Sequence, residues 1–144
     1  MSQNDQEFKK IWSVRESIAT ISAKEGNVFA YDISYDISSW EEMMKFLRKK
    51  YSRTVVLGYG HIGDGNIHIN ICVKKNDTET KVDDVEIFEK VAEKQGSISA
   101  EHGVGLHKPH HLHIQKSPQI LYLYRQIKDN FDPKGILNPY KVVP

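Results

Sequence analysis

Asp64-Gly65 stands between two segments of strand-like sequence, and this pair constrains the fold more than any other feature of the chain. An Asp-Gly pair between apolar segments is among the strongest short-range signals for a two-residue β-hairpin turn. The segment after the pair alternates, with isoleucine or valine at every second position and polar or small residues between them. We therefore predict two antiparallel strands, over residues 54–61 and 67–73, with one apolar and one polar face.

The first of these strands also carries the spacing G-x-G-x-x-G, at Gly58, Gly60 and Gly63. In dinucleotide-binding proteins this spacing opens a helix whose N-terminus binds the pyrophosphate. Here the turn and a second strand follow instead of a helix. The sequence therefore argues against a Rossmann-type nucleotide site.

Hydrophobic periodicity predicts the other elements. They are a helix over 6–24, a strand over 28–34, helices over 40–51 and 82–91, a short strand over 97–100 and a last helix after Ser117. From residue 28 the order is β-α-β-β-α-β, which is the ferredoxin-like pattern of an antiparallel sheet with two helices on one face. We predict an α+β fold with this ferredoxin-like sheet in one domain over residues 1–144. The N- and C-terminal helices are expected to pack around the sheet.

Charge and composition exclude several classes of protein. With 20 Lys+Arg against 19 Asp+Glu, the net charge of +1 offers no electrostatic case for a nucleic-acid partner. No apolar run is long enough for a membrane span, and the first residues have neither a secretory nor a transit signal. The single cysteine, Cys72, excludes an intramolecular disulfide framework and a cysteine-rich zinc module.

Two histidines flank the predicted turn. Counting outward from its centre places His61 opposite His68, on the face away from the isoleucines. Directly opposed residues have Cβ atoms about 4.5–5.5 Å apart, so the two imidazoles could share one divalent metal ion. Glu101 is the candidate third ligand, and this donor set suits zinc or manganese. The alternative is two surface histidines beside a tight turn and a polar loop at Glu101.

Other polar residues near these positions have more than one interpretation. His102, next to Glu101, is a candidate general base because a free imidazole titrates near neutral pH. The histidines at 107, 110, 111 and 113 are interpreted as a solvated loop, since Pro109 breaks the helical periodicity and no acidic partner lies nearby. Arg15 falls on the apolar stripe of the first helix. A side chain that packs its apolar stem along the stripe and keeps its charged end in water would explain this position.

Three motifs resemble those of one enzyme family. Residues 60–70, GHIGDGNIHIN, resemble the G-H-[ILV]-G-D-G-N-[ILV]-H motif of the FAD-linked D-2-hydroxyacid dehydrogenases. Residues 99–105 resemble their S-[AG]-E-H-G-[IV]-G motif, and residues 131–141, FDPKGILNPYK, resemble their C-terminal signature. The resemblance implies the C-terminal substrate-binding, or cap, domain of the vanillyl-alcohol-oxidase flavoprotein superfamily.

The resemblance also implies a role for each matching position. The roles are metal ligands at His61, His68 and Glu101, a general base at His102, substrate contacts at Arg15, Asn70 and His102, and flavin contacts at Asn138 and Lys141. The metal, typically zinc, would hold a small 2-hydroxyacid such as D-lactate or D-2-hydroxyglutarate while hydride passes to FAD. Ala19 and Ala30 replace polar residues that many relatives carry, which favours a smaller acid such as lactate.

By this resemblance the chain lacks the N-terminal FAD-binding domain, which would be its partner. We expect the isolated chain to be inactive and colourless, and the parent enzyme to be mitochondrial. We also expect self-association, through the site face or the first helix, because the small net charge opposes it little. The alternative function is a non-enzymatic metal- or partner-binding remnant, such as an actin-interacting scaffold.

Overall fold

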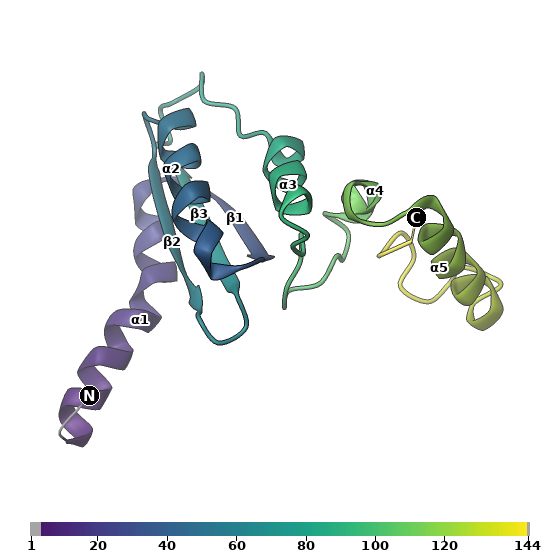
Figure 1. Cartoon of the computed structure of the whole chain (residues 1–144), viewed down its shortest axis with the longest axis horizontal. Coiled ribbons are helices and arrows are strands. Elements are labelled where there is room, and N and C mark those ends of the chain that lie inside the picture. Colours follow the sequence, from purple (N-terminus) through teal and green to yellow (C-terminus); the bar gives the residue numbers. More distant parts are fainter. Residues whose placement is uncertain (1–3, 144) are drawn as a thin grey trace.

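The computed structural model describes residues 4–143, which form an antiparallel sheet with helices around it (Figure 1). The strands are β1 (Asn27–Ser34), β2 (Val55–His61) and β3 (Asn66–Val73), and their order in the sheet is β1-β3-β2. The predicted α+β class is confirmed, and the glycine-rich segment is strand, turn and strand as expected.

The predicted short strand over 97–100 is wrong. Only Ser97 pairs with the sheet, through an isolated antiparallel bridge to Ser34 at the free edge of β1. Beyond it the chain leaves the ladder. The Ser99 N–H bonds to the Ser97 hydroxyl, and the Ala100 N–H bonds to the carbonyl oxygen of Asp32. The N–H groups of Glu101 and His102 bond to the Asp32 side chain. The fourth strand of a ferredoxin-like sheet is thus reduced to a single pair.

One face of the sheet carries the hydrophobic core. Helices α2 (Trp40–Lys50) and α3 (Asp84–Glu93) cover it, and a 3₁₀ turn, Ile37–Ser39, leads into α2. The alternating apolar residues of β3 lie at the centre of this core and are less than 4% exposed, namely Ile67, Ile69, Ile71 and Val73. The predicted apolar face is therefore confirmed, together with its two helices.

The opposite face is covered in part by α1 (Asp5–Glu25). The C-terminal half of α1 lies against the sheet, where the buried Ser22 hydroxyl accepts a hydrogen bond from the Asn70 amide at 3.0 Å. The N-terminal half extends away from the sheet (Figure 1), and Phe8 and Trp12 stack on each other there while each is 54% exposed. The expectation that the first helix packs on the sheet holds only for its second half.

The C-terminal part lies apart from the sheet. A 3₁₀ turn, Pro109–His111, and the short α4 (Leu112–Gln115) lead to α5 (Pro118–Phe131), which has no buried residue among those described. The expectation that the last helix packs on the sheet is wrong, because α4 stands between them (Figure 1). The histidine-rich segment is not simply a solvated loop either, since His111 is buried against the Phe88 ring.

The hairpin between β2 and β3 has a longer turn than the sequence predicts. Residues 62–65 form a four-residue turn, so His61 pairs with Asn66, and His68 lies opposite Tyr59. The Asp64 carboxylate accepts the Asn66 backbone N–H at 3.1 Å, an interaction that stabilises this wider turn. Direct opposition of the two histidines is therefore wrong, but they still share a face as diagonal neighbours.

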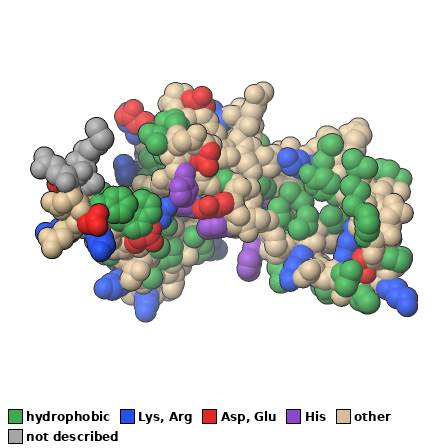
Figure 2. Space-filling view, turned by 90° about the horizontal axis from the view of Figure 1, so that it is seen from below, with side chains coloured by type: hydrophobic (Ala, Val, Ile, Leu, Met, Phe, Trp, Pro, Cys, Tyr) green, Lys and Arg blue, Asp and Glu red, His purple; other side chains and the backbone are tan. Residues whose placement is uncertain are grey.

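Large apolar side chains remain exposed at both ends of the molecule. They lie on the N-terminal half of α1, which extends away from the sheet, and on α5 and the segment that follows it (Figure 2). Within residues 4–143, no helix has both the length and the apolar character that crossing a bilayer requires.

Candidate functional site

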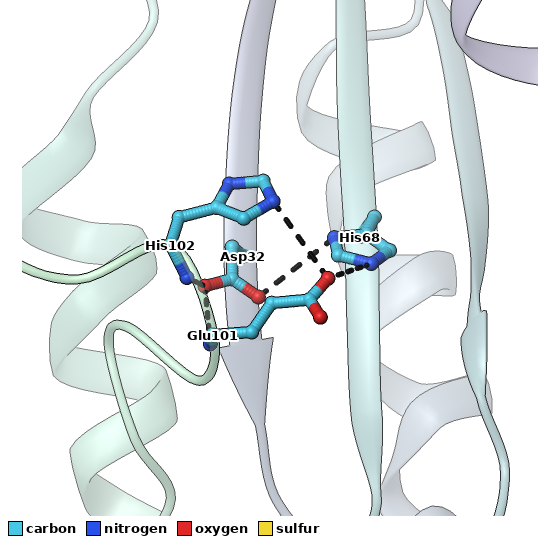
Figure 3. Close-up of side chains that lie close together, drawn as sticks. All are labelled: Asp32, His68, Glu101 and His102. Carbon is cyan, nitrogen blue, oxygen red and sulfur yellow. Dashed lines mark hydrogen bonds and ion pairs between the residues drawn. The ribbon is translucent and has the colours of Figure 1, made fainter.

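The candidate site lies on the polar face of the sheet, at the end nearest the β2–β3 hairpin. Alternation along the strands places His68 of β3 between Asp32 of β1 and Tyr59 of β2. The segment after Ser97 crosses this end of the sheet and brings Glu101 and His102 over it (Figure 3). Residues from three separate parts of the chain therefore meet at His68.

The Glu101 carboxylate is the centre of this arrangement. Its Oε1 lies 2.8 Å from His68 Nε2, 3.8 Å from His61 Nε2 and 3.7 Å from His102 Nε2. The His102 ring stacks on the His68 ring, with centroids 5.3 Å apart and an interplanar angle of 21°. Three imidazole nitrogens thus face one carboxylate oxygen, and all four atoms are of the kinds that divalent cations accept as ligands.

Asp32 is a site residue that sequence reasoning did not single out. It is 2% exposed and lies opposite His68 in the β1–β3 register. Its carboxylate accepts hydrogen bonds from the backbone N–H groups of Glu101 and His102, at 2.8 and 2.7 Å, and from the Asn66 amide at 2.8 Å. The signal in the sequence was an acidic residue on the polar face of an otherwise apolar strand.

Burial and hydrogen bonds set the charges of the two most buried groups. Burial alone would raise the pKa of the Asp32 carboxyl, but the hydrogen bonds it accepts, first of all from the His102 N–H, lower that pKa below its ordinary value. Burial lowers the pKa of His68, and the carboxylates of Glu101 and Asp32 only partly offset this effect. The site therefore favours an ionised Asp32 beside a neutral His68 imidazole, whose lone pair can bind a metal ion.

Arg15 reaches the site from α1. Its Nη2 lies 3.3 Å from His61 Nε2, and its Nη1 pairs with Glu16 at 2.9 Å. A guanidinium only donates, so this contact uses the Nε2 lone pair of His61, and Arg15 must turn away when that nitrogen binds a metal ion. The side chain is half-exposed and runs beside the Trp12 ring, as a snorkelling arginine would, yet its charged end lies at the candidate site.

Three of the expected site residues lie elsewhere. The Asn70 amide is buried under α1, where it bonds to Ser22. Asn138 and Lys141 lie in the exposed C-terminal segment and bond to each other, with Lys141 Nζ 3.0 Å from Asn138 Oδ1. The structure therefore brings together His61, His68, Glu101, His102 and Arg15, while Asn70, Asn138 and Lys141 make no hydrogen bond to them in the part of the chain that is described.

Among residues 4–143, one group of side chains has the spacing of a metal site. It comprises Asp32, His68, Glu101 and His102, whose ligand atoms lie within 4.8 Å of one another. His61 adds a further nitrogen at 3.8 Å from the same Glu101 oxygen. Neutral imidazoles and carboxylates are the donors that zinc and manganese accept, so this group fits a divalent cation.

Comparisons with known proteins agree with the three motifs. The family described as FAD linked oxidases, C-terminal domain, matches residues 1–142. The chain is 38% identical to a probable mitochondrial D-2-hydroxyglutarate dehydrogenase of Oryza sativa subsp. japonica and 37% identical to the mitochondrial D-2-hydroxyglutarate dehydrogenase of Bos taurus. It is also 34% identical to a putative mitochondrial D-lactate dehydrogenase of Schizosaccharomyces pombe. These alignments cover 99–100% of this chain but only 26–30% of each relative.

Proposed function

The chain belongs to the family of FAD linked oxidases, C-terminal domain, and on this premise we propose that it is the substrate- and metal-binding part of a flavin-dependent D-2-hydroxyacid dehydrogenase. The observation that carries the proposal is the convergence of three imidazole Nε2 atoms on one Glu101 oxygen, at 2.8, 3.7 and 3.8 Å. A 2-hydroxyacid presents a hydroxyl and a carboxylate on adjacent carbons. Such a pair suits a site with a hard cation, a base and an arginine close together.

His61, His68 and Glu101 would hold the divalent metal ion. Their donor set of two imidazoles and one carboxylate leaves coordination positions open, which is typical of catalytic rather than structural metal sites. A metal bound there would act as a Lewis acid that polarises the substrate hydroxyl. The low pKa of His68 supports this assignment, because the imidazole is already neutral at physiological pH.

His102 would take the hydroxyl proton at its Nε2. This imidazole is 61% exposed, and it lies 3.7 Å from the Glu101 oxygen that marks the centre of the site. A neutral imidazole next to the polarised hydroxyl is suited to general-base work near neutral pH. Arg15, whose guanidinium lies at His61, would bind the substrate carboxylate.

The flavin would be held mainly by residues outside this chain. Asn138 and Lys141 are exposed, and Lys141 Nζ donates a hydrogen bond to Asn138 Oδ1. We therefore assign these two residues at most to the rim of an FAD site. The parent enzyme, by its likeness to relatives named mitochondrial, would act in that organelle.

A small 2-hydroxyacid fits this surface better than a dicarboxylic one. Ala30 lies on the same face of β1 as Asp32, opposite Asn70, and it is exposed. It brings no cation to this part of the site, and neither does Ala19 on α1. A second substrate carboxylate would lack a partner there, so we propose a substrate of the size of lactate.

The test is metal and ligand binding by the purified chain. Metal-free protein titrated with Co²⁺ should bind about one ion and develop a visible ligand-field spectrum. Addition of D-lactate should change that spectrum, L-lactate should change it less, and D-2-hydroxyglutarate should require a higher concentration. His68→Ala should abolish the spectrum, because it removes the ligand closest to Glu101.

His113→Ala is the matched control, since this exposed histidine lies away from the site and its Nδ1 bonds to the His110 carbonyl oxygen, 2.7 Å away. It should bind Co²⁺ as the unchanged chain does. Equal binding by His68→Ala and His113→Ala would contradict the metal assignment. A Co²⁺ spectrum that no hydroxyacid alters would instead favour the alternative of a metal-binding module without this activity.

A further inference from the structure

We propose that Asp32 is the positioning residue of this site, because its one carboxylate holds the Glu101-His102 segment in place and orients the His68 ring. The expected effect of Asp32 on metal binding rests on the proposed function. Its role in holding the Glu101-His102 segment rests only on hydrogen bonds within the chain.

The geometry around Asp32 is that of an anchor. The side chain is 2% exposed, near the C-terminal end of β1, and an acidic residue is costly to bury without partners. Its Oδ2 accepts two consecutive backbone N–H groups, those of Glu101 and His102, and its Oδ1 accepts the Asn66 amide. Hydrogen bonds to a charged acceptor are the strong ones, so this carboxylate fixes the crossing segment directly on the sheet.

This anchor explains how two adjacent residues reach one point. In a regular strand, neighbouring side chains face opposite ways, which would separate Glu101 from His102. Because both N–H groups turn toward one Asp32 oxygen, the backbone bends at this place. The Glu101 carboxylate then reaches His68 from one side while the His102 ring lies over it (Figure 3).

Asp32 also faces the ring nitrogen of His68 that does not point toward Glu101. Its Oδ1 lies 3.8 Å from His68 Nδ1, a distance for electrostatic attraction rather than a hydrogen bond. Without a metal ion, the closer Glu101 oxygen, 2.8 Å from Nε2, favours the proton on Nε2. When a metal ion binds Nε2 the proton must lie on Nδ1, and Asp32 is the carboxylate that faces it there. The Asp32 side chain thereby helps to position two of the proposed metal ligands, Glu101 and His68.

A variant with the same shape separates positioning from mere stability. In Asp32→Asn, the remaining carbonyl oxygen can still accept the two backbone N–H groups. The Asn66 side chain now donates from its Nδ2 to Asp32, and rotation of this amide by half a turn would present its unpartnered Oδ1 to the new amide as an acceptor. The fold should therefore be kept, while the negative charge is lost.

The experiment compares the unchanged 144-residue chain with Asp32→Asn and Asp84→Asn by NMR and by Co²⁺ titration. Asp84 is the matched control because its carboxylate accepts a hydrogen bond from Tyr31, the β1 neighbour of Asp32 on the opposite face. In Asp32→Asn, the amide protons of Glu101 and His102 should shift upfield, and the ring resonances of His68 should shift because the negative charge beside Nδ1 is lost. Co²⁺ affinity should fall about 10–100-fold, and Asp84→Asn should change none of these.

The result that would overturn the inference is an Asp32→Asn variant with unchanged Glu101, His102 and His68 resonances, or with Co²⁺ affinity within twofold of the unchanged chain. If the unchanged chain binds no Co²⁺ at all, the metal site of the proposed function fails on its own. The amide and ring resonances then still decide whether Asp32 positions these groups.

Discussion

Replacing Gly60 by alanine should separate the two strands that carry the histidines. A Cβ at this position would lie 2.2 Å from the Asn66 carbonyl oxygen and 2.9 Å from Ile67 Cα, whereas ordinary contacts begin at 3.4 Å. Both atoms belong to the backbone of β3, so β2 must move away by about 1.2 Å, the difference between 3.4 and 2.2 Å. Overpacking costs about 1–3 kcal/mol, and the rigid neighbour places Gly60→Ala near the upper end of that range.

For a chain of this size, about 3 kcal/mol lowers the midpoint of thermal unfolding by roughly 6–12 °C. Circular dichroism measures this midpoint, and Co²⁺ titration shows whether His61, which follows Gly60, has left the site. Gly63→Ala is the control, since nothing lies within 4 Å of a Cβ there and its effect should stay within about 0.5 kcal/mol. Equal midpoints for the two variants would refute the close approach of the strands.

Three further outcomes follow from the burial and charge of single residues. Ile71→Ala, at a fully buried position of β3, should lower the free energy of unfolding by about 2–5 kcal/mol. Ile120→Ala, on the exposed α5, should change it by less than about 1 kcal/mol. Chemical denaturation measures both free energies. The hydrogen bond from Lys128 lowers the pKa of Asp132 below its ordinary value of 3.8; backbone N–H groups add to this effect and burial opposes it. The ionised Asp132 therefore stabilises the fold fully above its ordinary pKa of 3.8, and this stabilisation is lost as the pH falls through the pKa of the folded state. Lys128→Met should raise the pKa of Asp132 in an NMR titration, and an unchanged pKa would contradict the assignment. We predict that the chain self-associates through the exposed apolar half of α1, and that Trp12→Glu, which places a charge there, shifts it toward the monomer in sedimentation experiments.

The pattern of side chains along each strand was readable from the sequence because it depends only on local geometry. Successive residues of a strand face opposite ways, so alternation in β3 assigned Ile69 to the core and His68 to the polar face before any partner was known. The same rule kept His61 on the face of His68 although the predicted register was wrong. The sequence predicts a two-residue turn, whereas in the structure the Asp64 side chain accepts the Asn66 backbone N–H and the turn has four residues.

The meeting of distant segments depended on the tertiary structure. Asp32 and the Glu101-His102 pair lie about 70 residues apart, and their contact exists because the chain leaves the ladder after Ser97 and its N–H groups find a buried carboxylate. Likewise Arg15 reaches His61 only because half of α1 packs across the sheet. Periodicity reports which face of an element a residue occupies, whereas contacts between elements depend on loop lengths and packing. The sequence therefore determined the histidine-bearing hairpin and its polar face, and the tertiary structure decided which carboxylates and which arginine complete the site.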